Sequence, residues 1–218
     1  MDSPLCRIGV FFDGAFFIYA QNHYYHDRGL GWLEFTPFLS LIDRFIQESD
    51  QGCVNYRVVY AAWHQGLFPS DKADERHLRT DRERHMALLA AGIEPKFLPM
   101  SQSGSEKGVD VALAIDALQA GLERKIDVAV LVTGDADHVP LARTLMKQGI
   151  RVAVVYFGYQ SGENKGFANE RLLKACNYTL NVNDLEADHE YQELFTGLFR
   201  RSENSKTKSR PDEDLKAA

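Results

Sequence analysis

The sequence predicts an α/β fold, a three-layer sandwich in which helices cover both faces of a mostly parallel central sheet. Short runs rich in valine, isoleucine and aromatic residues alternate with longer segments of helical periodicity along most of the chain. Strands separated by helices of about 10–15 residues are typical of parallel sheets, because right-handed crossovers connect them. The chain shows no internal repeat.

Each predicted element follows from a local signal. The strands are short β-branched or aromatic runs bounded by turn-forming residues: residues 7–12, 54–62, 94–99, 128–133, 151–157 and 178–182. The helices carry apolar residues at helical spacing: residues 15–22, 37–48, 72–91, 110–124, 138–148, 169–175 and 183 to about 198. Thr36 and Pro37 supply an N-cap and a first-turn proline, and Gly92 and Gly149 stop the helices that precede them. The aromatic stretch at 23–32 indicates a loop or insertion.

One domain and a tail account for the chain. A length of 218 residues suffices for one sizeable core, which we expect over residues 1–199. Residues 200–218 are polar and charged, and we expect a disordered tail there. The formal net charge of −6 argues against a strongly basic nucleic-acid binder. It does not exclude an enzyme that meets a polyanion through a local basic patch.

Cysteine usage and hydropathy indicate a cytoplasmic protein. Cys6, Cys53 and Cys176 lie far apart without metal-ligand spacing, so we expect buried, reduced thiols. Asp13 interrupts the apolar run near the N-terminus, and no signal-peptide cleavage site follows it. No stretch approaches the roughly 18 uninterrupted apolar residues of a membrane span, so we expect no membrane partner.

Four aspartates occupy positions where predicted strands end or helices begin. Asp13 follows the first strand, Asp110 opens a helix, and Asp135 and Asp137 follow the strand at 128–133. A turn or an N-cap explains any one of them. The carboxyl ends of parallel strands, however, are where ligands bind, and carboxylates gathered there repel one another unless a cation is present. Because Mg²⁺ favours oxygen ligands, the four together predict a metal site.

The helix at 110–124 directs its aspartates to different sides. Its predicted apolar face consists of Val111, Ile115, Leu118 and Leu122. Asp116 lies roughly 120° from Asp110 around the helix axis. We therefore expect Asp116 to support the site indirectly or to bond to a neighbouring loop.

Three blocks of the sequence resemble the NYN domain family. They include Phe12-Asp13-Gly14-Ala15, Lys107-Gly108-Val109-Asp110 and Thr133-Gly134-Asp135-Ala136-Asp137-His138. The resemblance covers approximately residues 7–185 in the family's order. It implies a PIN-like, Rossmann-like fold and a ribonuclease whose acidic residues hold Mg²⁺ or Mn²⁺. At the matching positions, Asp13, Asp110, Asp135 and Asp137 are implied to bind metal and catalyse, and Asp116 matches a recurrent aspartate.

Two positions depart from the family pattern. Phe16 stands where many relatives have an asparagine, which favours the alternative of an RNA-binding regulatory module with weak or no catalysis. His138 stands where an aromatic residue, often phenylalanine, is common. We expect it either to touch the substrate or to pack at a helix start.

A phosphotransfer protein is a third functional alternative. A phosphatase with Asp13 as nucleophile would need an acidic residue where Ala15 stands, so the sequence does not favour a phosphatase.

The expected partner, by resemblance, is RNA, single-stranded or looped because splayed bases stack on aromatic rings. Lys107 either steadies a phosphate or relieves carboxylate repulsion, and Thr133 either donates a hydroxyl or caps its turn. Arg76 and Arg79 lie in a helix of interleaved charges, which fits a solvated surface or a phosphate-contacting face. The aromatic surplus at 23–35 fits base stacking, a core edge or a homodimer contact.

Overall fold

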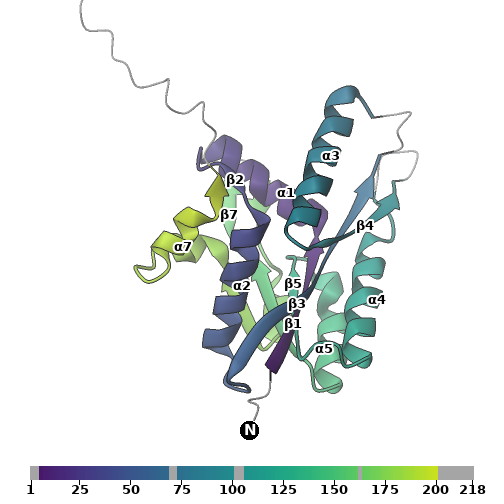
Figure 1. Ribbon diagram of the computed structural model, residues 1–218, viewed down its shortest axis with the longest axis vertical. Helices are drawn as coiled ribbons and strands as arrows, with labels where there is room; N and C mark the ends of the chain where they lie inside the picture. Colours follow the sequence, from purple (N-terminus) through teal and green to yellow (C-terminus); the bar gives the residue numbers. More distant parts are fainter. Residues whose placement is uncertain (1–4, 69–72, 101–105, 162–163, 201–218) are drawn as a thin grey trace, which may run out of the picture.

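A six-stranded parallel sheet forms the centre of the computed structural model, which describes residues 5–68, 73–100, 106–161 and 164–200. Its strands, in chain order, are β1 (Leu5–Asp13), β3 (Asn55–Leu67), β4 (Glu94–Pro99), β5 (Val128–Val132), β6 (Arg151–Tyr156) and β9 (Tyr178–Asn181). Helices lie on both faces of the sheet (Figure 1), so the predicted α/β sandwich with a parallel central sheet is confirmed.

The two helical layers follow from the two hydrophobic cores. One face carries α1 (Gly14–Asn22), α2 (Phe35–Ser49), α3 (Glu75–Ala90) and α7 (Gln192–Gly197). The other carries α4 (Val109–Leu122), α5 (Val139–Lys147) and α6 (Glu170–Ala175). Short elements complete the described part. They are the π-helical turn η1 (His23–Asp27), the 3-10 helices η2 (Ala136–His138) and η3 (Val182–Glu186), and the short strands β2 (Trp32–Leu33), β7 (Tyr159–Ser161), β8 (Asn164–Gly166) and β10 (Phe199–Arg200).

The chain reverses its progress across the sheet between β1 and β5. The strand order is β4-β3-β1-β5-β6-β9, so the chain adds β3 and β4 on one side of β1 and then returns to its other side. The carboxyl ends of β1 and β5 therefore flank the topological switch point, where open α/β sheets bind ligands. Phe12 is the register partner of Val132, which sets Asp13 beside the exit of β5.

An aromatic cluster fixes the start of α1. The Phe17 ring lies 5.7 Å from Phe12 of β1, 5.3 Å from Phe38 of α2 and 5.5 Å from Trp63 of β3, between ring centroids. All four side chains are fully buried. Because α1 begins directly after Asp13, this packing also fixes the position of that aspartate.

Several predicted elements have different boundaries. β3 continues to Leu67 because the residues after position 62, including Trp63, remain buried in the sheet. α2 begins at Phe35, which packs into the core, so Glu34 rather than Thr36 is the N-cap residue. The helix predicted from residue 183 to about 198 is interrupted between η3 and α7. There Asp188 accepts a hydrogen bond from Glu190 N at 2.9 Å, a local bond that competes with helix.

The outward side of α4 is apolar, which corrects the predicted orientation of this helix. Its buried residues are Val109, Leu113, Ala117, Ala120 and Gly121. Val111, Ile115 and Leu122 are instead 61%, 59% and 55% exposed. The prediction assigned the larger side chains to the core, but α4 lies too close to its neighbours to hold them. A Cβ at Gly121 would come within 2.4 Å of Ile150 Cδ1.

The remaining predictions concern the tail, the thiols and the membrane. Arg200 ends β10, which pairs with β2, and residues 201–218 lie outside the described residues. The three cysteines are free thiols; Cys6 is buried, and Cys53 and Cys176 are partly buried. No helix of the described part is long and apolar enough to cross a bilayer.

A buried carboxylate ties the amino ends of the strands together. Asp50 Oδ2 lies 2.5 Å from Arg151 Nη1 at the start of β6. Asp50 Oδ1 accepts hydrogen bonds from Tyr178 Oη at 3.1 Å and from Gly52 N at 3.0 Å. Asp50 therefore joins the end of α2 to two parallel strands.

We predict that Asp50→Ala lowers the free energy of unfolding by about 2–4 kcal/mol, because it leaves the Arg151 charge partly buried without its partner. Urea denaturation measures the change. The control is Glu48→Ala, which removes an exposed ion pair between Arg44 Nε and Glu48 Oε1 at 2.7 Å. It should lower the free energy of unfolding by less than about 1 kcal/mol. Equal losses in the two variants would contradict the structural role of Asp50.

Candidate metal centre and groove

Asp13 ends β1 and begins α1. Its Oδ1 accepts a hydrogen bond from Phe16 N at 3.1 Å and so caps the helix. Its Oδ2 accepts a hydrogen bond from Thr133 Oγ1 at 3.3 Å, across the carboxyl ends of β1 and β5. One oxygen of Asp13 is thus committed to α1, and the other faces the space between the strand ends.

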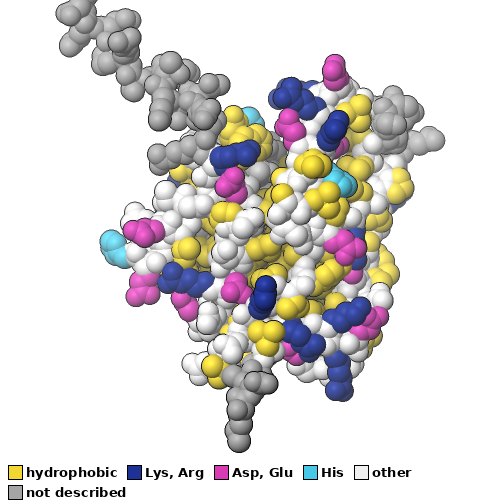
Figure 2. All heavy atoms as spheres, viewed as in Figure 1, with side chains coloured by type: hydrophobic (Ala, Val, Ile, Leu, Met, Phe, Trp, Pro, Cys, Tyr) yellow, Lys and Arg dark blue, Asp and Glu magenta, His cyan; other side chains and the backbone are white. Residues whose placement is uncertain are grey.

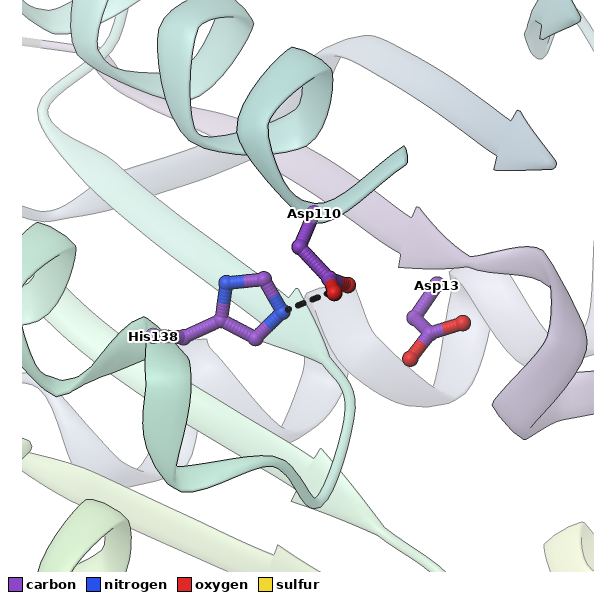
Figure 3. Close-up of side chains that lie close together, drawn as sticks. All are labelled: Asp13, Asp110 and His138. Carbon is purple, nitrogen blue, oxygen red and sulfur yellow. Dashed lines mark ion pairs between the residues drawn. The ribbon is translucent and has the colours of Figure 1, made fainter. Parts of the chain in front are cut away.

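Three side chains from different elements converge at this space (Figure 3). They are Asp13 of β1, Asp110 in the first turn of α4, and His138 at the end of η2. One ligand atom from each lies within 4.8 Å of the other two. His138 Nε2 is 3.7 Å from Asp110 Oδ1; the Asp110 side chain is 55% exposed and that of His138 only 1%. Two carboxylates and an imidazole form a donor set suited to a divalent cation.

The acidic side chains of this region disfavour one another's ionisation. Burial raises the pKa of Asp13 above its usual range; the Phe16 N–H opposes this and the Asp110 charge adds to it. Burial also raises the pKa of Glu106; its bond from Gly66 N, at 2.9 Å, opposes this, and the charges of Asp13 and Asp110 add to it. A bound cation would remove this repulsion, so the residues present fit a metal ion.

Glu106 and His138 extend the predicted site in different ways. Sequence reasoning did not select Glu106, although it directly precedes the block that contains Asp110 and lies four residues before that aspartate. His138 was expected to touch the substrate or to pack at a helix start. The structure buries it at a helix start with its ring toward Asp110.

Asp135 and Asp137 follow β5 but lie outside the group of three that the described residues form. Asp135 Oδ1 accepts a hydrogen bond from Asp137 N at 2.9 Å and caps η2. Its own N–H donates to Thr133 Oγ1 at 3.3 Å. Both carboxylates are exposed, and Asp135 lines the same groove as Asp13. The structure thus brings Asp13 and Asp110 together, with Asp135 on the groove wall and Asp137 at the surface.

Asp116 belongs to a separate polar cluster between α4 and the edge of the sheet. Its carboxylate accepts hydrogen bonds from Lys96 Nζ at 2.7 Å and Tyr60 Oη at 3.0 Å, and lies 3.2 Å from His64 Nε2. Burial raises the pKa of Asp116, but His64 and Lys96 lower it by more. Asp116 therefore fastens α4 to β3 and β4, and it positions Asp110 only through the helix that they share.

A groove of about 890 Å³ extends from Asp13 and Asp135 along α1. Its aromatic lining consists of Phe16, Tyr19, His23, His26, Tyr159 and Phe167. Tyr19 and Phe167 are 67% and 55% exposed, and His23 stacks on Tyr159 with ring centroids 4.1 Å apart. None of the described residues that line the groove is lysine or arginine.

The aromatic stretch after α1 divides between core and groove. Tyr24 and Phe35 are buried, and the Tyr25 ring stacks on Trp32 at 4.3 Å. His23 and His26 are the members of this stretch that line the groove. Most of these rings therefore build structure, as their size favours.

The basic residues selected from the sequence are exposed and lie outside the groove lining. Lys107 precedes α4, and Arg76 and Arg79 lie on α3, whose buried residue is Leu88. Arg79 Nε is 2.9 Å from Glu83 Oε1. Figure 2 shows basic and acidic side chains side by side at the projecting end of α3. Asp13 and Asp110 are together called the acidic group. Within the described part, no ion pair joins Lys107, Arg76 or Arg79 to this acidic group.

Comparisons with known proteins agree with this architecture. A model of the NYN domain matches residues 7–183. A crystal structure of a protein of unknown function from Vibrio parahaemolyticus RIMD 2210633 is similar, with a TM-score of 0.56 and 20% sequence identity over 82% of this chain and 93% of that chain. At this identity the likeness supports the fold alone. No curated protein matches the chain.

The raised pKa of Asp13 predicts that its ionisation destabilises the metal-free protein. A carboxyl with a higher pKa in the folded state stabilises the fold fully below its unfolded pKa, and this contribution is lost as the pH rises through the folded pKa. Asp13→Asn keeps a capping side chain without the charge. At about pH 7 its melting temperature should exceed that of the wild type, and the difference should shrink toward about pH 4.

Differential scanning calorimetry of the metal-free proteins measures this difference. Asp188→Asn, at an exposed turn position that also caps a backbone N–H, is the control and should leave the melting temperature nearly unchanged. A lower melting temperature for Asp13→Asn at neutral pH would contradict the electrostatic account.

Proposed function

This chain belongs to the NYN domain family, and we propose that it is a divalent-metal-dependent ribonuclease that hydrolyses RNA phosphodiester bonds. One observation carries the proposal: Asp13, Asp110 and His138 converge at the switch point of the sheet. The family's PIN-like nuclease relatives, together with this donor set, support a divalent cation there, for which Mg²⁺ and Mn²⁺ are the candidates.

Asp13 and Asp110 would hold the cation, and neighbouring residues would support them. When bound, a divalent ion would supply an activated water and would neutralise charge on a phosphate oxygen. Thr133 orients Asp13 through its hydroxyl hydrogen bond, and Asp135 stands on the groove wall next to it. Glu106 carries a raised pKa beside these carboxylates, which suits it to hold and pass on a proton during hydrolysis.

Single-stranded or looped RNA is the substrate class that the groove supports best. Exposed rings such as Tyr19 and Phe167 offer faces to unpaired bases, whereas a duplex keeps its bases stacked inside. Arg76, Arg79 and Lys107 are proposed as phosphate contacts outside the groove, where each would steepen the salt dependence of binding. The free thiols support a cytoplasmic location.

The second candidate is an RNA-binding regulatory module without turnover, and Phe16 favours it. The Phe16 ring lies beside Asp13 on the groove wall and packs against Phe157 at 5.7 Å. It is also close to Gly134, where a Cβ would come within 3.0 Å of Phe16 Cε2. An apolar ring therefore occupies the place of a polar side chain that many relatives are expected to use in orienting substrate.

We predict that Asp13→Asn and Asp110→Asn each lower the cleavage rate at least about 10³-fold, because each removes a charge that holds the cation. Labelled single-stranded and hairpin RNAs are incubated with Mn²⁺, Mg²⁺ or EDTA, and the products are resolved by electrophoresis. Asp188→Asn is the matched control and should cleave as the wild type does. Circular dichroism should show that all variants are folded.

Three outcomes of this experiment are decisive. Metal-dependent cleavage that both site variants lose supports the nuclease. RNA binding without cleavage under any metal condition supports the regulatory module. Degradation that persists in EDTA and in Asp13→Asn overturns the proposed site.

Ring stacking in the groove yields a separate prediction on affinity. Tyr19→Ala and Phe167→Ala should each weaken binding of a single-stranded RNA by about 1–3 kcal/mol, the value of one base–aromatic stack. Fluorescence anisotropy with the cation present and a single-stranded RNA analogue that resists hydrolysis measures binding without cleavage. Phe68→Ala removes a ring that is 44% exposed and does not line the groove, so it serves as the control. Equal affinity in all three variants would exclude stacking at these rings.

A further inference from the structure

His138 is a buried polar side chain that faces the acidic group without a hydrogen bond at its Nε2. The ring is 1% exposed, and Nε2 has no hydrogen-bond partner among the described residues. Its separation from Asp110 Oδ1, 3.7 Å, is too long for such a bond. A buried nitrogen left unsatisfied costs folding free energy, so a partner in the working protein is expected at this point.

The surrounding backbone holds the ring in this orientation. Asp135 caps η2 through Asp137 N, and Pro140 stands in the first turn of α5. α5 is anchored in turn by Leu141 and Leu145, which are buried against the sheet. His138 lies at the junction of these two elements, and Figure 3 shows its imidazole directed at Asp110, with the Asp13 carboxylate beyond.

We propose that His138 is a nitrogen ligand of the cation that Asp13 and Asp110 hold, so that the site takes a first-row transition ion such as Mn²⁺ in preference to Mg²⁺. Mg²⁺ binds oxygen ligands, whereas imidazole is a ligand of transition ions. Ligand atoms that share one ion at about 2.0–2.2 Å lie about 3–4 Å apart. The three donors lie within 4.8 Å of one another, and the exposed Asp110 side chain can rotate to close the difference.

Calorimetric titration of the metal-stripped full chain with Mn²⁺ and with Mg²⁺ tests this ligand assignment, which rests on the metal site of the proposed function but not on cleavage. The wild type should bind Mn²⁺ at least about 10-fold more tightly than Mg²⁺. His138→Phe, with a ring of similar size, should weaken Mn²⁺ binding about 10–100-fold and change Mg²⁺ binding by less than about threefold. His138→Gln should also lose the preference for Mn²⁺ over Mg²⁺, and this second substitution controls for a folding defect of His138→Phe. His189→Phe, at an exposed histidine, is the matched control.

Pulsed electron paramagnetic resonance of bound Mn²⁺ provides a readout that is independent of affinity. The wild type and His189→Phe should show coupling to an imidazole nitrogen, and both His138 variants should lose it. If Mn²⁺ binds in a manner that depends on Asp13 but shows no nitrogen coupling, the His138 assignment is overturned and the carboxylate site stands. If the wild type binds neither ion, the metal site of the proposed function falls as well.

The outward face of α4 carries a second, independent inference. Val111, Ile115, Leu118 and Leu122 follow one another at alternating spacings of four and three residues, the pattern of a seam between paired helices. Val111, Ile115 and Leu122 are more than half exposed, and Leu118 is partly buried against the core at the edge of the stripe. Isolated exposed apolar residues are ordinary, whereas a continuous stripe marks an interaction surface. Apolar side chains are visible in Figure 2 along the molecular edge where Figure 1 places α4.

We infer that a second copy of this chain covers the stripe, with its α4 antiparallel to the first. The stripe is symmetric about its midpoint, so a two-fold axis brings Val111 onto Leu122 of the second copy and Ile115 onto Leu118. In the metal-free protein, charge agrees with this direction. Glu106, Lys107 and Asp110 make the start of α4 net negative, and Glu123, Arg124 and Lys125 make its end net positive.

Sedimentation velocity at micromolar concentration tests the homodimer. The wild type should sediment as a dimer, and Ile115→Glu as a monomer with an unchanged circular dichroism spectrum. Met86→Glu, at a residue of α3 that is 60% exposed, should remain dimeric. A monomeric wild type, or an Ile115→Glu variant that stays dimeric, overturns this inference.

Discussion

The parallel pairing of β1 with β5 is the interaction on which the site depends. The chain builds outward from β1 in one direction and later returns to its other side, so the crossovers of β1 and β5 diverge. Asp13 leaves β1 at this opening, and Thr133 leaves β5 opposite it, within hydrogen-bond distance. α4 then delivers Asp110, and the turn after β5 delivers His138. A shift in the register between β1 and β5 would therefore separate the four residues Asp13, Thr133, Asp110 and His138.

The structural and the proposed functional roles of Asp13 are compatible, because a carboxylate has two oxygens. Oδ1 caps α1, as an aspartate before a helix commonly does. Oδ2 faces Thr133 and the neighbouring carboxylate of Asp110. Asp135 also caps a turn, but it is exposed and stands apart from the group of three. Without a cation, the proximity of the Asp13 and Glu106 carboxylates to Asp110 lowers the free energy of unfolding, because the three charges repel one another. Such a cost is expected where a site is organised for function rather than for stability.

Local signals predicted the fold and part of the site. Alternating apolar runs and helical segments were sufficient for the α/β sandwich, and the two aspartates that meet, Asp13 and Asp110, each lie at an element boundary. His138 and Glu106 gained their importance from burial between elements, which no local pattern encodes. The orientation of α4 was mispredicted because both of its sides are apolar. Only the close approach at Gly121 decides which side faces the sheet.

The groove indicates how an acidic protein would accept a polyanion. The chain has a formal net charge of −6, and the described groove lining contains carboxylates but no lysine or arginine. A phosphate would therefore be repelled unless a cation lay at the acidic group, so in the proposed function binding and metal occupancy are coupled. The remaining affinity would come from rings, which stack on any base and need no charge. Phe16 extends this aromatic wall to Asp13, so in the proposed function its ring would hold a base next to a phosphate bound at Asp13 and Asp110.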